Sequence, residues 1–240
     1  MNLEKMIFRT HKLLMKGYVT TLLDYNLQMA QPLPPGPVIL AANHPTTTDP
    51  FLLPLLVNEP VFIFVAGMAF EVPVLGRMIA KAGHIRVNAD LISRMNTLQQ
   101  AVERLAGGGS IGIFPEGSLS PEPGAFCRPR SGAARIALAS GAPVVPVGIH
   151  HSPDACYHRQ LTTPQHQQTA RWVYRGAYFV TAGEPLYFTG DSTSSWDARR
   201  VSTRIMDAIQ AQAQLSKQRM LSHPVRWQAR IPRLLRGESR

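Results

Sequence analysis

The segment Asn43-His44-Pro45-Thr46-Thr47-Thr48-Asp49 directly follows an apolar, β-prone run at residues 38–42. A histidine and an aspartate five residues apart do not share a helix face, because five residues advance a helix by about 500°. Across a strand-to-helix turn, the aspartate can instead fold back and hold one imidazole nitrogen, which leaves the other nitrogen free to remove a proton. This is the His–Asp half of a hydrolytic triad without its serine, so an incoming substrate hydroxyl would be the nucleophile. The alternative is structural, because Asp49 followed by Pro50 also suits the start of a helix.

A second segment, Ile113-Phe114-Pro115-Glu116-Gly117-Ser118, ends another predicted buried strand. Open α/β sheets place their active sites at the carboxyl ends of their strands, so Glu116 and Gly117 are expected at the same edge as His44. Gly117 would let backbone N–H groups face a ligand there. The alternative is an ordinary turn between a strand and a loop.

Two familiar patterns do not fit their required context. The glycines of Gly107–Gly112 match both G-x-S-x-G and G-x-G-x-x-G, but each motif works only where a strand turns into a helix. Here a predicted helix precedes the glycines and a strand follows, which indicates a helix end and a turn. His151, Cys156 and His158 fit no common zinc spacing, so we expect no metal site.

The rest of the chain predicts an α/β fold with a mostly parallel or mixed central sheet and helices on both faces, since short apolar runs alternate with helical patterns. Residues 152–170 are polar and rich in Gln, His and Thr, which favours a loop or insertion. The predicted strands are 38–42, 61–66, 84–87, 111–114, 144–149, 171–174 and 178–181, and the predicted helices are 49–57, 74–82, 93–106, 131–140 and 196–215.

An amphipathic N-terminal helix is predicted over about Leu3–Gln28, before a proline-rich joint at residues 31–37. At about 100° per residue, its basic residues fall on one stripe and its apolar residues on the other side. This pattern is typical of a helix in a membrane interface, and equally of a helix packed on its own domain with a solvated cationic face. The basic stripe holds Lys5, Arg9, Lys12 and Lys16, and the apolar side holds Leu3, Met6, Ile7, Leu14 and Tyr18.

Composition limits the class of protein. The 240 residues are 45% hydrophobic, which excludes a disordered or fibrous chain. Lys and Arg exceed Asp and Glu by 25 − 15 = +10, and the last segment, Lys217–Arg240, holds seven basic residues and one acidic residue, or +6. Such an excess attracts anionic partners. We find no secretory signal, no apolar stretch of the roughly 20 residues that span a bilayer, and no nucleic-acid motif. With two cysteines, an intracellular protein is expected.

Four motifs in order and spacing resemble those of the glycerolipid acyltransferases, the lysophosphatidic acid acyltransferase group. The first is Asn43-His44-x4-Asp49, and the third is Phe114-Pro115-Glu116-Gly117-Ser118, about seventy residues later. Between them, Gly83-His84-Ile85-Arg86-Val87 resembles the second motif, and Val144–Ile149 resembles the fourth. Arg130-Ser131-Gly132-Ala133-Ala134 resembles the family's basic helix start. The resemblance covers about residues 38–150.

The resemblance implies a catalytic pair, with His44 as general base on the acceptor hydroxyl and Asp49 orienting it. The hydroxyl would attack the thioester of an acyl-CoA or acyl carrier protein directly, without an acyl-enzyme and without a metal or redox cofactor. Glu116, Gly117 and Ser118 would line the acceptor site, and Arg86, with Arg130, would hold the acceptor's phosphate. One position departs from the family: Leu119 stands where an arginine usually helps to clamp that phosphate.

The expected activity is O-acyl transfer to a lysophospholipid, most simply 1-acylglycerol-3-phosphate. Leu119 motivates one alternative, a non-phosphate acceptor such as a lyso-aminolipid or glycolipid, and the net charge motivates another, a non-catalytic module that binds anionic lipid. Three parts are expected: an N-terminal membrane-proximal helix over residues 1–30, one acyltransferase domain over 31–215, and a basic tail over 216–240. The basic ends predict a peripheral protein on an anionic membrane surface, at the cytoplasmic face of the membrane, with no nucleic-acid partner.

Overall fold

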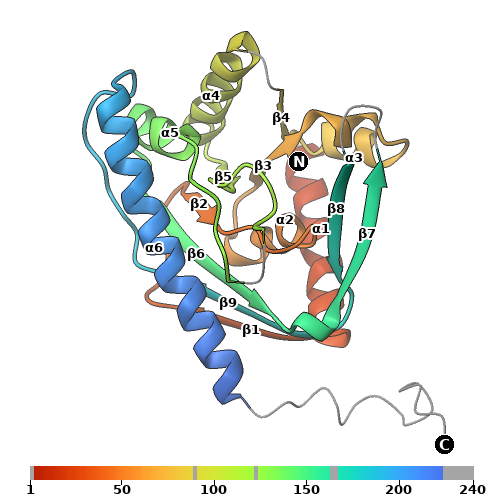
Figure 1. Cartoon of the computed structure of the whole chain (residues 1–240). Helices are drawn as coiled ribbons and strands as arrows, with labels where there is room; N and C mark the ends of the chain where they lie inside the picture. Colours follow the sequence, from red (N-terminus) through yellow and green to blue (C-terminus); the bar gives the residue numbers. More distant parts are fainter. Residues whose placement is uncertain (1–2, 89–90, 122–123, 163–166, 224–240) are drawn as a thin grey trace, which may run out of the picture.

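The computed structural model describes residues 3–88, 91–121, 124–162 and 167–223. A seven-stranded sheet in the order β1-β9-β6-β2-β5-β3-β4 organises them (Figure 1). The strands are β1 Leu23–Met29, β2 Ile39–Ala42, β3 Val61–Ala66, β4 Ile85–Val87, β5 Ser110–Ile113, β6 Val144–His151 and β9 Gly176–Ala182. A separate antiparallel hairpin pairs β7 Cys156–Thr162 with β8 Gln167–Val173.

Strand direction divides the sheet into two parts. Strands β6, β2, β5, β3 and β4 are mutually parallel, whereas β9 is antiparallel to β6 and parallel to its other neighbour β1. The mixed sheet and the N-terminal helix confirm the predicted fold class. The carboxyl ends of the five parallel strands therefore share one edge, and β9 starts near that same edge, where Tyr178 pairs with His151.

Helices cover both faces of the sheet because the inner strands are apolar on both sides. Along β2, Leu40 and Ala42 belong to one core with α1 and α2, while Ile39 and Ala41 belong to the other core with α4, α5 and α6. Figure 1 shows α1 and α6 on opposite sides of the sheet. The α-helices are α1 Leu3–Thr21, α2 Asp49–Leu52, α3 Leu75–Lys81, α4 Leu91–Ala106, α5 Gly132–Ser140 and α6 Ser195–Ser222, with 3-10 turns η1 Leu53–Leu56, η2 Gly67–Glu71 and η3 Pro153–Ala155.

The long helix α6 lies directly against β6, and Gly148 makes this approach possible. A Cβ atom at Gly148 would lie 1.9 Å from the backbone nitrogen of Ala213, so no other residue fits there without moving the helix. The Ser216 hydroxyl donates to the Gly148 carbonyl at 2.8 Å. This close packing fixes β6, whose carboxyl end lies beside the loop at residues 43–49 that follows the neighbouring strand β2.

The N-terminal prediction was wrong in its length. The helix ends at Thr21, and residues 23–29, predicted as its continuation, form β1 in register with residues 176–182. The hydroxyls of Thr20 and Thr21 bond to main-chain carbonyls one turn earlier, a local pattern that competes with helix propagation. The apolar residues then alternate with polar ones, as in a strand.

The second half of the chain holds two further differences. Residues 152–170, predicted as a loop or insertion, contain η3, β7 and most of β8, because backbone pairing with each other satisfies these polar strands. Helix α6 continues to Ser222, so it crosses the expected boundary between residues 215 and 216. Residues 224–240, which hold most of the predicted basic tail, lie outside the described residues. In the described part of the chain, no helix combines the length and hydropathy that a bilayer-spanning helix requires.

Candidate active site

The loop at residues 43–49, called here the catalytic loop, brings His44 and Asp49 together. It leaves the carboxyl end of β2 and turns into α2, and the His44 Nδ1 atom lies 3.0 Å from Asp49 Oδ2. Asp49 is completely buried, whereas 17% of the His44 side chain is exposed. The carboxylate points back at the imidazole, and the N-cap position of α2 is Thr48, without a side-chain cap bond. The geometry thus favours the brace over the helix cap as the role of Asp49.

Asp49 is held by three other groups. Its Oδ2 atom accepts from the Thr46 backbone N–H at 2.8 Å, and its Oδ1 atom accepts from the Thr46 hydroxyl and, at 2.6 Å, from the Tyr178 hydroxyl. A buried carboxylate is stable only when hydrogen bonds replace its lost hydration. These donors supply that replacement, so the carboxylate keeps one orientation toward His44.

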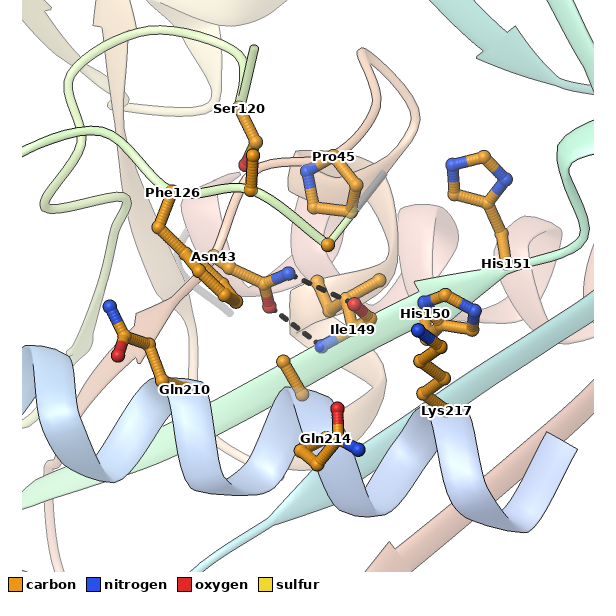
Figure 2. Close-up of a pocket in the computed structure, with 13 residues that line it drawn as sticks. Asn43, Pro45, Ser120, Phe126, Ile149, His150, His151, Gln210, Gln214 and Lys217 are labelled. Carbon is orange, nitrogen blue, oxygen red and sulfur yellow. Dashed lines mark hydrogen bonds between the residues drawn. The ribbon is translucent and has the colours of Figure 1, made fainter. Parts of the chain in front are cut away.

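The remaining polar residues of the loop anchor it to its neighbours. The Asn43 amide donates to the Ile149 carbonyl at 2.9 Å and accepts from the Ile149 N–H at 2.7 Å, which extends the β2–β6 pairing by one side chain (Figure 2). The Thr47 and Thr48 hydroxyls accept from backbone N–H groups of β8. The hairpin that the sequence did not predict therefore supports the catalytic loop.

A small pocket of about 70 Å³ lies beside Asn43, between the catalytic loop, the end of β6 and α6. Figure 2 shows residues that line it. His150 and Lys217 line it, together with Gln210 and Gln214 of α6. Burial and the nearby Lys217 lower the pKa of His150 to about 4. This histidine is therefore neutral at physiological pH.

The imidazole of His44 is open on the side away from Asp49. It stacks on Phe114 with ring centroids 4.0 Å apart, and among the described residues its Nε2 atom has no hydrogen-bond partner. His44, Phe114, Gly117 and Leu119 line a large, mostly apolar cleft of about 2910 Å³ that also runs along α1 and η2. An imidazole that is braced at one nitrogen and has its other nitrogen free on such a cleft has the geometry of a general base.

The role expected for Glu116 is corrected by its environment. Its side chain is 3% exposed and is not part of the cleft wall. The carboxylate instead accepts from the His44 backbone N–H at 3.1 Å, from the Ser120 hydroxyl at 2.8 Å and from the Cys127 backbone N–H at 2.7 Å. Glu116 thus ties the catalytic loop to the loop after β5 rather than lining an acceptor site.

Gly117, Ser118 and Arg130 do lie on the cleft. Gly117 has φ +68°, and a Cβ there would lie 2.5 Å from Arg130 Nε, so the guanidinium crosses directly over this glycine. Arg130 is exposed, and its guanidinium has no partner among the described residues. Ser118 is exposed, with its hydroxyl 3.8 Å from Cys127 Sγ. Arg130 is therefore a cation available to an anionic ligand.

Arg86 does not join Arg130. Its guanidinium pairs with Glu71 of η2 at 2.9 Å, contacts Asn88, and lies over the Phe70 ring, outside the cleft lining. Strand β4 stands three positions from β2 in the sheet, or roughly 14 Å at the usual strand spacing. In this structure the Arg86 guanidinium is thus engaged by Glu71, whereas the Arg130 guanidinium lies over Gly117. Among the described residues, no group of three His, Cys, Asp or Glu side chains is arranged to hold a metal ion.

Comparison with known proteins supports the motif assignment. The family model described as Acyltransferase matches residues 24–150, which is more than half of the chain. The chain belongs to the acyltransferase family.

Among curated members of this acyltransferase family, a 1-acyl-sn-glycerol-3-phosphate acyltransferase of Chlamydomonas reinhardtii is 33% identical over 121 residues, which are 49% of this chain and 35% of that protein. A chloroplastic 1-acyl-sn-glycerol-3-phosphate acyltransferase of Brassica napus is 31% identical over 114 residues, 47% of this chain and 33% of that protein. The chain thus spans about a third of the length of these relatives.

Among solved structures, the crystal structure of the 1-acyl-sn-glycerophosphate (LPA) acyltransferase PlsC from Thermotoga maritima has a TM-score of 0.64 at 18% identity. The match covers 92% of this chain and 82% of that one. At this identity the likeness shows a shared fold. Together with the family model, these matches confirm the resemblance to the glycerolipid acyltransferases.

Two residues of the site were not predicted from the sequence, and both lie beyond the segment that the acyltransferase model matches. Tyr178 bonds to Asp49, and the buried Arg171 of β8 donates from its guanidinium to the Ser120 carbonyl and pairs its backbone with Thr47. Arg171 was predicted as the first residue of a strand, directly after the segment predicted as a loop. A tyrosine at the start of a predicted buried strand was the one available signal for Tyr178.

Proposed function

We propose that this acyltransferase-family protein transfers a fatty acyl group from a thioester donor to the hydroxyl of a lysophospholipid, most simply 1-acylglycerol-3-phosphate. The observation that carries the proposal is the His44–Asp49 pair, with its free Nε2 atom on an apolar cleft and no protein nucleophile required. The named activities of the curated relatives support the same substrate class.

The chemical step follows from this geometry. The acceptor hydroxyl loses its proton to His44 Nε2 while its oxygen attacks the thioester carbonyl carbon. The tetrahedral intermediate then collapses, the carbon–sulfur bond breaks, and the proton passes from the imidazolium to the leaving thiolate. An oxygen ester and a free thiol result, so atoms and charge balance. Asp49 stabilises the imidazolium that forms between the two stages.

A thiol-release assay tests the proposal. Purified protein is given acyl-CoA, or acylated carrier protein, with and without lysophosphatidic acid, and free thiol is measured. We expect acceptor-dependent thiol release in the wild type and a loss of about 10²–10⁴-fold in His44→Ala, the usual contribution of a positioned base. His150→Ala is the matched control, because this histidine lies on the other, small pocket. No release from any donor would leave the non-catalytic lipid-binding alternative in place.

A second candidate keeps the reaction and changes the acceptor to one without phosphate, such as a lyso-aminolipid or glycolipid. Two observations favour it: Leu119 stands on the cleft where the family usually carries arginine, and Arg86 is neutralised by Glu71. Arg130 is then a cation on the cleft for which the described residues provide no ion-pair partner. Turnover on a panel of phosphorylated and unphosphorylated acceptors separates the two candidates, since activity confined to the second group rejects lysophosphatidic acid.

We further propose that α1 docks the protein on an anionic membrane surface. The helix packs on its own domain through Phe8 and Val19, and its outward face is apolar, with Leu13 and Leu14 71% and 63% exposed. Basic residues flank this face, as in helices that lie in a lipid interface. Leu3 and Met6 are also exposed, as are Met68, Val72 and Met78 near the cleft. An acceptor that resides in a bilayer would reach the cleft from this side.

Vesicle sedimentation tests the docking surface. We expect the wild type to bind vesicles that contain phosphatidylglycerol, and the double variant L13S/L14S to bind several-fold less. Leu221→Ser is the matched control, because Leu221 is 73% exposed but lies on α6. Equal loss in both variants, or none in L13S/L14S, would contradict the assignment of α1 as the docking surface.

A further inference from the structure

Tyr178 hydrogen-bonds Asp49 of the His44–Asp49 pair, although it lies outside the segment that the family model matches. It is fully buried in β9, with its backbone paired to Tyr25 on one side and His151 on the other. Because β9 starts at the sheet edge where β6 ends, the Tyr178 ring lies next to the catalytic loop. Its hydroxyl donates to Asp49 Oδ1 at 2.6 Å.

The hydrogen bonds of Asp49 divide between its two oxygens. The Oδ2 atom accepts from His44 Nδ1 and from the Thr46 backbone N–H, both in the catalytic loop. The Oδ1 atom accepts from the Thr46 and Tyr178 hydroxyls. A carboxylate oxygen accepts about two hydrogen bonds, so the set is complete. Of these donors, Tyr178 alone comes from another part of the chain, 129 positions away. It is the one that ties the pair to the sheet.

We propose that Tyr178 is a positioning residue of the acyl-transfer site, which fixes the Asp49 carboxylate and moderates its negative charge toward His44. This inference rests on the proposed function, in which His44 must be neutral to accept the hydroxyl proton. With the tyrosine donor present, part of the carboxylate charge is engaged at Oδ1. Without it, more of that charge acts on the imidazole, which then holds a proton up to a higher pH.

The phenol is suited to this role. Burial and the adjacent Asp49 charge raise the pKa of Tyr178 well above its usual value. It therefore remains a donor throughout any practical assay range. Tyr178→Phe removes one oxygen atom and keeps the ring, so the packing of the core is nearly unchanged.

Other titratable groups surround the His44–Asp49 pair, and they must be the same in the proteins whose pH profiles are compared. Burial lowers the pKa of His151 and raises the pKa of the Cys156 thiol, and both groups sense Asp49. Around the catalytic loop, the described titratable or charged groups include His151 on β6, Cys156 and His158 on β7, Arg171 on β8, Tyr25 on β1, His11 on α1 and Glu116 after β5. The variants below leave all of these unchanged except Tyr25, which is the control.

Tyr25 provides a matched control within the same stack. Its ring is stacked on that of Tyr178 with centroids 6.2 Å apart, and its buried hydroxyl has no hydrogen-bond partner in the part of the chain that the structure describes. Tyr25→Phe makes the same chemical change at a neighbouring position that does not touch Asp49. We expect it to retain the activity and the pH profile of the wild type, and to melt at the same or a higher temperature, because it removes an unsatisfied buried group.

The test compares kcat, KM and the pH profile of thiol release in both variants. For Tyr178→Phe we expect kcat to fall about tenfold, the lower end of the value of a charge-assisted hydrogen bond, with KM for donor and acceptor little changed. The acid side of the pH profile should move to higher pH. A lower melting temperature with unchanged kcat and pH profile would overturn the proposal and leave a purely structural role.

Two further outcomes are covered. If Tyr178→Phe does not fold, Thr46→Val removes the other hydroxyl at Oδ1, and a shift of the acid side to higher pH supports the proposal while an unchanged profile overturns it. If the wild type releases no thiol, the proposed function is contradicted instead, because the role of Tyr178 can be measured only in an active enzyme. Failure of the function and failure of this inference are thus distinguished by the first measurement.

Discussion

The catalytic loop and the two arginines expected to bind the acceptor, Arg86 and Arg130, are built in opposite ways. In the loop, Asp49 is fully buried and each of its carboxylate oxygens is occupied. By contrast, Arg130 is exposed and free of partners among the described residues, and Arg86 forms an ion pair in which its own side chain is 46% exposed and Glu71 is 72% exposed. Exposed pairs of this kind contribute little to stability.

This contrast separates two tasks. Groups that perform the chemistry must be held in one geometry before the substrate arrives, because a small misplacement costs rate. Groups that receive the head group of the acceptor can remain solvated and adjustable until it binds. The structure therefore constrains the reaction type more tightly than the identity of the acceptor. Substitutions in the catalytic loop are expected to lower kcat, and substitutions of the arginines to raise KM by a smaller factor.

The largest effect is expected from Asp49→Asn. The amide keeps one acceptor oxygen for donors that now use two, and its NH₂ group faces hydrogen-bond donors. We expect kcat to fall by about 10²–10⁴-fold together with a lower melting temperature, since buried groups are left unsatisfied. Asp207→Asn, an exposed aspartate on α6, is the matched control. Near-normal kcat in Asp49→Asn would show that the loop is a scaffold and that the chemistry lies elsewhere.

A smaller effect, on KM more than on kcat, is expected when the arginines are changed. Arg130→Ala should raise KM for a phosphate-bearing acceptor by about 10- to 100-fold, as for a lost charge-assisted hydrogen bond, with kcat less affected. Arg86→Ala, the matched arginine, should change KM by less than about threefold, because its charge is already paired and solvent-exposed. A larger effect of Arg86 than of Arg130 would mean that substrate binding rearranges η2 and brings Arg86 into the cleft.

The same contrast explains what the sequence predicted well. Strand β3 was predicted with its observed limits, and β2 and β6 nearly so, because strands buried on both faces are continuous apolar runs. The His44–Asp49 pair was also predicted, since both residues belong to one short loop between a strand and a helix. Local patterns contain the information for such features.

The features that were missed depend on partners far away in the chain. Residues 23–29 do alternate apolar and polar side chains, but this short run follows the amphipathic stretch of α1 directly, and only its pairing with β9 fixes it as a strand. The polar β7–β8 hairpin has no apolar signal of its own. The motif around Glu116 did not indicate that its side chain is buried and accepts hydrogen bonds from three donors in the surrounding loops. Likewise, the ion pair of Arg86 with Glu71 and the bond of Tyr178 to Asp49 arise only once the chain has folded.

A last comparison sets His44 against a second histidine, His84 of the second motif, which also lines the cleft. His84 is not braced by a carboxylate: its Nδ1 atom accepts from the Ile63 N–H at 3.2 Å, and burial lowers its pKa to about 4. The folded state therefore binds fewer protons than the unfolded chain between pH 6.5 and about 4. Stability must then fall as the pH falls through this window, by up to roughly 3 kcal/mol for one such group.

His84→Asn keeps an acceptor for Ile63 and removes the titration, so the loss of stability between pH 6.5 and 4 should become shallower. It should not vanish, because His150, whose pKa is also lowered to about 4, remains. Denaturant unfolding at pH 7 and at pH 5 measures the difference directly, with His44→Asn as the matched variant. If His44→Asn flattened the dependence as much as His84→Asn does, the catalytic loop would be a pH-sensitive part of the fold, and the contrast between a poised base and a merely buried imidazole would fail.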